Sequence, residues 1–166
     1  MKMPICDSCL RGGPLCQKCG KKLKEGKISE LDVEVSRALY ELAREYRELE
    51  GIELERALRE RGLTALVVRG STRIADEKDE IIRKLGERLN TRVRLAESGE
   101  EIRKLAQDIL APARVNGVNI LFKKGGGEEY RVRIKRTDLM LLPSGIDTLQ
   151  KIMGEVTSKD IKFVFE

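Results

Sequence analysis

The sequence predicts an α+β protein built from small parts: an N-terminal four-cysteine module, a helical segment, and two α+β units, the first of them degenerate. Three observations lead to this prediction. All four cysteines lie within the first nineteen residues. Apolar residues recur at helical spacing in several later stretches, and short β-branched or alternating runs lie between them. We expect the parts to span residues 1–27, 28–62, 63–99 and 100–166.

The cysteines form two Cys-x-x-Cys pairs, Cys6 with Cys9 and Cys16 with Cys19. Such pairs let four thiolates converge on one tetrahedral Zn²⁺, so we expect a structural zinc ribbon or a pair of zinc knuckles with Zn²⁺ as cofactor. Two disulfides, or a redox Cys-x-x-Cys, are the alternatives. Disulfides are disfavoured because the chain has no signal peptide and no other cysteine, as expected in a reducing cytoplasm. A redox motif is disfavoured because it would not need to occur twice.

The composition favours a cytoplasmic protein. Charged residues make up 37% of the chain, while histidine and tryptophan are absent. This profile is typical of heat-adapted proteins. No apolar run approaches the roughly 18 to 20 residues of a membrane span, so we expect no membrane partner.

Positive charge is concentrated at the two ends of the chain. Residues 1–27 carry a net charge of +5 and residues 111–166 a net charge of +3, while residues 28–62 carry −4. Polyanions would therefore prefer the cysteine module and the C-terminal third. A basic pI near 9.1 is nevertheless common among proteins that bind no nucleic acid.

The N-terminal half predicts a linker and two helices. Residues 20–27 form a basic tether between glycines, and its Lys21 and Lys22 could contact phosphates. Ser29 is a candidate N-cap for a helix over residues 29–50. Residues 53–61 predict a second, short helix that ends at Gly62.

The next segment predicts a strand, a helix and a strand. Residues 63–68 form a nearly continuous β-branched and apolar run, which predicts a buried strand ending at Gly70. Residues 76–90 show an apolar stripe at helical spacing, and residues 91–95 alternate as a half-buried strand should.

The last third predicts one complete α+β unit. We expect a helix over residues 100–110 closed by Pro112, then strands 114–123 and 129–136 joined by a triple-glycine hairpin turn. A helical turn (138–142), a helix (146–156) and a strand (161–165) follow. The expected core residues are Ile134, Leu149, Ile152, Phe163 and Phe165.

Cations alternate along the strand 129–136. Arg131, Arg133 and Lys135 share one sheet face, opposite Tyr130, Val132 and Ile134. Such a row is either a nucleic-acid backbone contact or an ordinary solvated face. The candidate RNA-binding residues of the whole chain are Lys21, Lys22, Arg69, Arg73, Arg114, Arg131, Arg133, Lys135, Arg136, Ser144 and Gly145.

From residue 100 onward, the order of elements is that of a type II KH module. The run Leu105-Ala-Gln-Asp-Ile-Leu-Ala-Pro-Ala-Arg-Val115 resembles the entry of a KH domain in the NusA transcription factor family, and residues 65–95 are similar to the second half of another such unit. The chain thus resembles an archaeal NusA-like tandem KH protein with an added zinc module. That resemblance implies RNA binding.

The chain departs from the KH pattern in one respect. KH domains clamp single-stranded RNA with a Gly-x-x-Gly loop, and no Gly-x-x-Gly occurs here. The corresponding positions read Gly70-Ser-Thr-Arg73 and Pro143-Ser-Gly-Ile146. We therefore expect cationic surfaces, more than a clamp loop, to carry RNA binding.

These features favour a non-catalytic RNA-binding protein of the translation or transcription apparatus, whose partner is ribosomal RNA or a nascent transcript. The alternative is a protein-interaction adaptor that docks on ribosomal proteins or RNA polymerase, with the KH-like units as scaffold. An enzyme with a small-molecule substrate is disfavoured because the chain has no histidine and no phosphate-cradling loop of the Walker kind.

Overall fold

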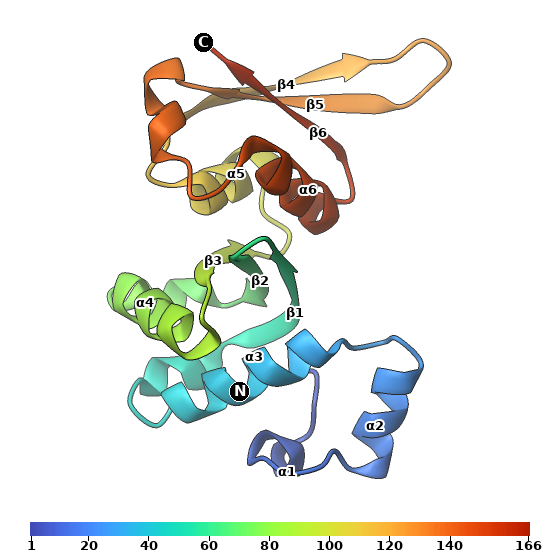
Figure 1. Cartoon of the computed structure of the whole chain (residues 1–166), viewed down its shortest axis with the longest axis vertical. Coiled ribbons are helices and arrows are strands. Elements are labelled where there is room, and N and C mark those ends of the chain that lie inside the picture. The colour runs from blue at the N-terminus through green and yellow to red at the C-terminus, as the bar shows by residue number, and fades with distance from the viewer.

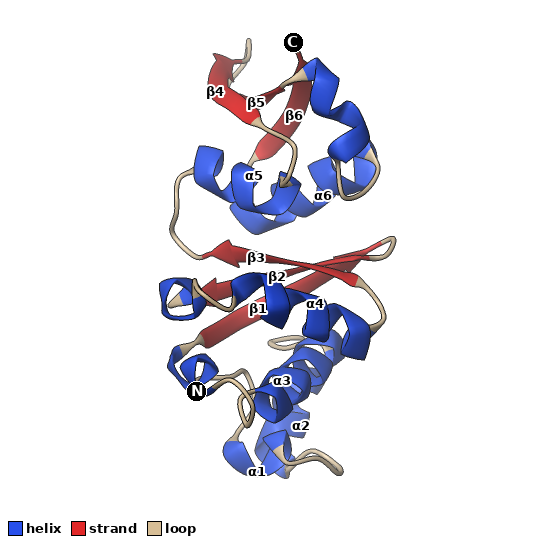
Figure 2. Ribbon diagram, turned by 90° about the vertical axis from the view of Figure 1, so that its left-hand side faces the viewer, coloured by secondary structure: helices blue, strands red, loops and turns tan.

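In a computed structural model, which describes all 166 residues, helices and sheets alternate in layers along the long axis (Figures 1 and 2). The fold class is α+β, as predicted. No helix is both long enough and apolar enough to cross a bilayer. The elements are α1 (Asp7–Leu10), α2 (Gln17–Lys24), α3 (Glu30–Leu42), η1 (Arg47–Gly51), β1 (Glu53–Glu60), β2 (Leu63–Arg69), η2 (Ser71–Ile74), α4 (Lys78–Leu89), β3 (Arg92–Glu97), α5 (Ile102–Leu110), β4 (Val115–Phe122), β5 (Glu128–Ile134), η3 (Arg136–Leu141), α6 (Ile146–Thr157) and β6 (Asp160–Phe165).

After α2 one order of elements occurs twice: helix, strand, strand, 3₁₀ turn, helix, strand. The first occurrence has an additional 3₁₀ turn, η1, after its first helix. We name residues 30–97 unit 1 and residues 102–165 unit 2. Each unit has one three-stranded sheet, in the orders β1-β2-β3 and β4-β5-β6. In both sheets the middle strand is antiparallel to the first strand and parallel to the third. The two units therefore share one topology.

The helix predicted for residues 53–61 is wrong, because these residues form strand β1. A β-bulge between Leu54 and Arg56 leaves Glu55 without a partner on β2. The extra residue places Leu54 and Ala57 on the same buried face, three positions apart. That spacing imitates a helix, and a strand without a bulge would alternate with a period of two.

The predicted boundary between residues 62 and 63 therefore divides unit 1. Helix α3 and strand β1 belong to the same core as β2, α4 and β3, so residues 28–62 are not a separate helical segment. Helix α3 begins at the predicted N-cap, where Ser29 and Asp32 form a reciprocal capping box. It ends at Leu42 instead of near residue 50, and η1 follows.

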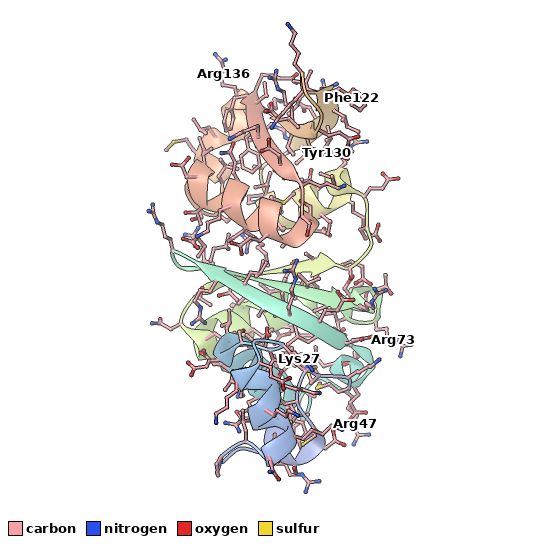
Figure 3. The ribbon with its side chains drawn as sticks, turned by 90° about the vertical axis from the view of Figure 1, so that its right-hand side faces the viewer. Lys27, Arg47, Arg73, Phe122, Tyr130 and Arg136 are labelled. Atoms are coloured by element: carbon pink, nitrogen blue, oxygen red, sulfur yellow. The ribbon has the colours of Figure 1, made fainter.

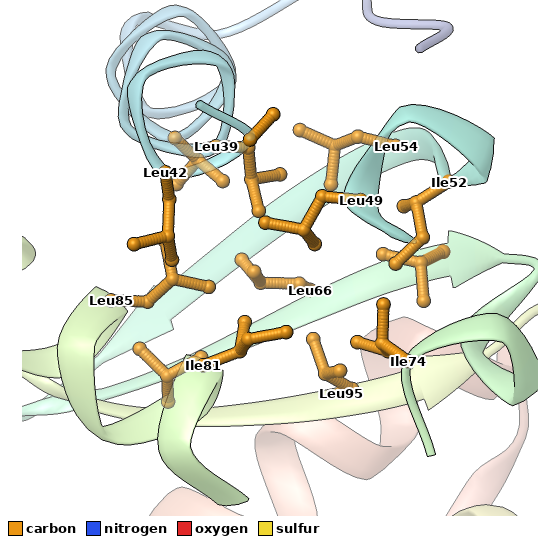
Figure 4. Close-up of a cluster of buried hydrophobic side chains, with 14 of the residues drawn as sticks. Leu39, Leu42, Leu49, Ile52, Leu54, Leu66, Ile74, Ile81, Leu85 and Leu95 are labelled. Carbon is orange, nitrogen blue, oxygen red and sulfur yellow. The ribbon is translucent and has the colours of Figure 1, made fainter. Parts of the chain in front are cut away.

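The core of unit 1 lies on one face of its sheet. Helices α3 and α4 cover this face, and the side chain of Leu66 on β2 lies between the sheet and these helices (Figure 4). Fully buried side chains from both helices meet it, including Leu39 and Leu42 of α3 and Leu85 of α4. Unit 1 therefore has a complete hydrophobic core.

The opposite face of the same sheet is also buried. Leu63, Ala65 and Ala96 are fully buried, and they belong to the core of unit 2 together with residues of α5 and α6. As a result β2 is buried from Leu63 to Val68, which confirms the predicted buried strand. We call this β1-β2-β3 sheet sheet 1 and the β4-β5-β6 sheet sheet 2. One face of sheet 1 therefore belongs to the core of unit 1, and its other face belongs to the core of unit 2.

Polar contacts also join the units. The Arg56 guanidinium on β1 donates to the Glu155 carbonyl near the end of α6, at 2.6 Å. Lys151 of α6 pairs with Glu60 of β1 at 2.9 Å.

In unit 2 the three predicted strands form one sheet, in which β5 pairs with β4 in antiparallel and with β6 in parallel direction. Of the expected core residues, Ile134, Leu149 and Ile152 are buried. Phe163 and Phe165 are half-buried and pack against that core from β6.

Replacing Ala65 by Arg tests the shared sheet. The equivalent residue of unit 2, by strand register, is Arg131, which lies on an exposed sheet face. Ala65→Arg buries an unpaired charge between the units, so the free energy of unfolding should fall by about 3 kcal/mol or more in urea titrations. Arg131→Ala is the control and should change it by less than about 0.5 kcal/mol. Equal stabilities of Ala65→Arg and the wild type would contradict the packing.

Candidate metal centre and candidate nucleic-acid interface

The four cysteines converge at the N-terminal end of the molecule. The Sγ atoms of Cys6, Cys9, Cys16 and Cys19 all lie within 4.8 Å of one another. None of the four is in a disulfide. The Sγ atoms of Cys6 and Cys16 are 3.9 Å apart, close to the roughly 3.8 Å edge of a tetrahedron with Zn–S bonds of about 2.3 Å. The geometry fits one metal ion with four thiolate ligands.

Two short helices place the sulfurs. Each Cys-x-x-Cys pair spans the start of a helix, with Cys6 as the N-cap of α1 and Cys16 as the N-cap of α2. Backbone N–H groups point at sulfurs: that of Cys16 donates to the Cys9 Sγ at 3.2 Å and that of Cys6 to the Cys19 Sγ at 3.4 Å. Such donors stabilise thiolates over thiols.

The sulfurs differ in their environments. Cys6 is exposed, and contact with the Ser8 hydroxyl lowers the pKa of its thiol to about 6. Cys19 is buried, and burial raises the pKa of its thiol to about 11. Four thiolates this close repel one another, and a bound divalent cation removes that repulsion.

The cysteine module is attached to unit 1. Arg37 of α3 donates from Nε to the Cys9 carbonyl at 3.0 Å and from Nη2 to the Gly13 carbonyl at 2.6 Å. Ile5 and Leu10 are buried in a small cluster with the cysteines, against which Val33 and Tyr40 of α3 pack. A metal ion held by all four sulfurs would have no open position for substrate.

A second feature is a cleft of about 810 Å³ where unit 1 meets unit 2. Its walls are α4 and the edge strand β3, and Asp108, Ala111 and Pro112 from the end of α5 close one side. Four cations line it: Lys78, Arg83, Arg92 and Arg94. Asp79 and Glu87 lie in the same cleft.

The cations of the cleft fall into two groups. Lys78 pairs with Asp108 at 3.8 Å, and Arg83 pairs with Glu87 at 2.7 Å. Arg92 and Arg94 contact no carboxylate; Arg92 donates to the Pro143 carbonyl at 2.8 Å, and Arg94 donates to the carbonyls of Val93 and Ala111.

Arg94 is incompletely satisfied. Its Nε is buried and has no hydrogen-bond partner. Burial, and to a smaller extent the charge of Arg92, lowers the pKa of its guanidinium. A bound anion would supply the counter-charge that the Arg94 guanidinium lacks.

The predicted RNA-binding residues do not form one site. Lys21 and Lys22 lie on α2 in the cysteine module, and Lys21 is 3.9 Å from Glu25. Arg69 ends β2 and pairs with Glu55 at 2.6 Å. Arg73 lies exposed in η2.

The predicted cation row on β5 lies on the outer face of sheet 2, where carboxylates neutralise most of it. Arg131 pairs with Glu129 at 2.8 Å, and Arg133 pairs with Glu166 at 3.3 Å.

The remaining predicted residues surround η3. Arg114 pairs with the buried Asp138 at 3.0 Å, and Lys135 and Arg136 begin the turn without a carboxylate partner. Ser144 and Gly145 immediately precede α6, and Gly145 is its N-cap.

Sequence reasoning missed Arg92 and Arg94. The available signal was their alternation with Val93 and Leu95 in the predicted strand, the same signal that singled out the row on β5. The cleft that these two arginines line is closed by residues of unit 2, which lie more than ten positions further along the chain.

No protein-family model matches the chain, and a search of curated proteins finds no match either. Among solved structures, the chain is similar to one described as "Crystal structure of APE1850", with a TM-score of 0.49 and 11% identity, over 76% of this chain and 96% of that chain.

Elemental analysis of the purified protein should find one metal ion per chain. Cys16→Ser removes one ligand, so metal affinity should fall at least about 100-fold, and NMR signals of residues 1–24 should lose dispersion because the metal supplies most of the folding free energy of this module. Signals of units 1 and 2 should persist, since their cores are separate clusters.

Ser8→Ala is the matched control, because Ser8 contacts Cys6 but is not one of the four ligands. It should retain one metal ion per chain. A metal-free protein with a folded N-terminus would contradict the assignment.

Proposed function

We propose that this protein is a non-catalytic, cytoplasmic RNA-binding protein of the translation or transcription apparatus, similar to archaeal NusA-like tandem KH proteins. Ribosomal RNA or a nascent transcript is its partner. The observation that carries the proposal is the pair Arg92 and Arg94, two cations on an edge strand that line a cleft and contact no carboxylate.

The cleft suits a single-stranded nucleic acid backbone. Phosphate oxygens would accept from the exposed Arg92 guanidinium and from the half-buried Arg94 guanidinium, both of which line the cleft. One side of β3 is unpaired, because the strand lies at the edge of sheet 1. Unpaired backbone groups along that edge could hydrogen-bond to base edges, as strand-edge recognition of other ligands does.

In the same proposal the four-cysteine centre holds Zn²⁺, which folds the N-terminal module and takes no part in chemistry. The module then offers a second basic surface. Lys18, Lys22 and Lys24 of α2 have no carboxylate within ion-pair distance, and weak phosphate contacts there would add to those at the cleft through linkage.

The topology supports the KH resemblance. Both units have the type II order, and both have a mixed sheet with the same strand directions. In each unit the turn between the middle strand and the following helix lacks a Gly-x-x-Gly, so we assign affinity to charge at the cleft more than to a backbone clamp.

Salt dependence tests the proposal. With a fluorescein-labelled mixed-sequence RNA of about 20 nucleotides, replacing both Arg92 and Arg94 by Ala should flatten the slope of log affinity against log salt by about 1 to 1.5, which corresponds to about two lost single-strand phosphate contacts. The readout is fluorescence anisotropy at four salt concentrations.

The matched control is Arg131→Ala with Arg133→Ala, which removes the same two charges from alternate positions of a strand. Because each has a carboxylate partner, their loss should flatten the slope by less than half as much. A larger effect from this pair would move the interface to the outer face of sheet 2. No RNA binding at low salt would reject the proposal altogether.

A further inference from the structure

Exposed large apolar side chains are confined to unit 2. Every large hydrophobic residue that is exposed lies between residues 120 and 146. Ile120, Leu121 and Phe122 lie at the end of β4, next to the hairpin turn. The others are Leu139, Met140 and Leu141 in η3 and Ile146 at the start of α6, exposed by 43%, 91%, 47% and 36%. We call these four residues the η3 surface.

The η3 surface is an addition relative to unit 1. The segment between the middle strand and the second helix runs over residues 70–77 in unit 1 and over residues 135–145 in unit 2, where it is three residues longer. The apolar residue of the unit 1 turn, Ile74, is fully buried. In unit 2 three consecutive apolar residues of the turn are exposed instead.

The turn that carries these side chains is held in place. Asp138 is buried, and its carboxylate accepts from the Arg114 backbone N–H at 2.9 Å and from the Arg114 Nε at 3.0 Å. The Arg136 N–H donates to the Glu166 carbonyl at 2.7 Å, and Arg92 of unit 1 binds the Pro143 carbonyl. A fixed apolar surface loses little conformational entropy on binding, which favours a docking role over a mobile loop.

The charges around this surface indicate what binds it. Lys135 and Arg136 start the turn without a carboxylate partner, and Arg92 is anchored beside Pro143. The Arg114 side chain is 63% exposed although it pairs with Asp138. Two exposed carboxylates lie nearby: Asp147 in the first turn of α6, and Glu166, whose side chain pairs with Arg133 at 3.3 Å. The rim therefore complements an acidic partner.

RNA and a second copy of the chain fit this surface less well. The four side chains are aliphatic, so they offer no aromatic ring on which bases could stack. The acidic helix α3 directs its apolar side into the core of unit 1. The remaining exposed apolar residues of the chain are those at the end of β4, beside Lys123 and Lys124.

We propose that the η3 surface docks an acidic amphipathic segment of another protein, whose aliphatic side chains pack on Leu139, Met140, Leu141 and Ile146 while its carboxylates pair with Arg136, Lys135 and Arg92. A helix with apolar residues at positions i, i+3, i+4 and i+7 matches a surface of this kind. Arg136 points away from the body at the end of unit 2, apart from Phe122 on the hairpin (Figure 3). The docking surface and the hairpin can therefore be tested separately.

The probe is a fluorescent 16-residue helical peptide with leucine at the four apolar positions and glutamate at most others. Anisotropy should show saturable binding to the full-length protein. A peptide with lysine in place of every glutamate should bind at least about tenfold more weakly, because the rim is cationic. Failure of the acidic peptide to bind, or equal binding of both peptides, would overturn the proposal.

A matched pair of variants locates the site. Met140→Ser with Leu141→Ser removes two adjacent exposed apolar side chains and should weaken binding of the acidic peptide at least tenfold. Leu121→Ser with Phe122→Ser makes the same change on the hairpin and should weaken it less than twofold. Equal losses in the two double variants would overturn the assignment.

Two further measurements separate the other occupants. Sedimentation velocity should show the same mass for the wild type and the Met140→Ser/Leu141→Ser variant; self-association lost in the variant would assign the surface to a second copy instead. The same variant should keep its RNA affinity within twofold, since neither Met140 nor Leu141 lines the proposed RNA cleft. Loss of RNA binding would assign the η3 surface to the RNA interface and reject the protein partner.

Discussion

The structure depends on a single sheet that is buried on both faces. Strand β2 supplies Leu66 to the core of unit 1 and Ala65, the next residue along the strand, to the core of unit 2. Because successive side chains of a strand point to opposite faces, alternate residues of β2 serve two different cores. Neither unit can lose this strand without exposing apolar surface of the other. The two units should therefore unfold together and keep a fixed relative position.

That fixed position creates the features on which the functional proposals rest. The cleft has α4 and β3 on one side and the end of α5 on the other, so it exists only because the units are fused. Arg92 and Arg94 reach from unit 1 to the carbonyls of Pro143 and Ala111 in the second half of the chain. The same contact at Pro143 helps to hold the turn that carries the η3 surface. Arg92 thus lines the proposed RNA cleft and also helps to hold the turn that carries the η3 surface.

Local patterns in the sequence predicted most of the elements. The wrong prediction for β1 has a local cause, whereas the cleft depends on tertiary packing. The cysteine spacing indicated the metal cluster because ligand pairs need only short-range geometry. The run over residues 63–68 indicated burial on both faces because every position is apolar or small. Strand β1 was misread because its bulge gives Leu54 and Ala57 a helical spacing, and β4 has the same irregularity between Val115 and Gly117.

The cleft was missed because its walls meet only through tertiary packing. Met140 was likewise unremarkable in the sequence, since an apolar turn is usually buried.

The outer face of sheet 2 has a consequence for how far this architecture can extend. In unit 1 the corresponding face of β2 carries Ala65 and Val67, both buried, and the helices of the next unit pack on Ala65. In unit 2 the equivalent positions along β5 hold Arg131 and Arg133, each tied to a carboxylate. A third unit stacked there would have to desolvate two ion pairs, which is unfavourable. These ion pairs make the outer face of sheet 2 similar to the polar outer face of a terminal solenoid repeat, so they disfavour the stacking of a further unit.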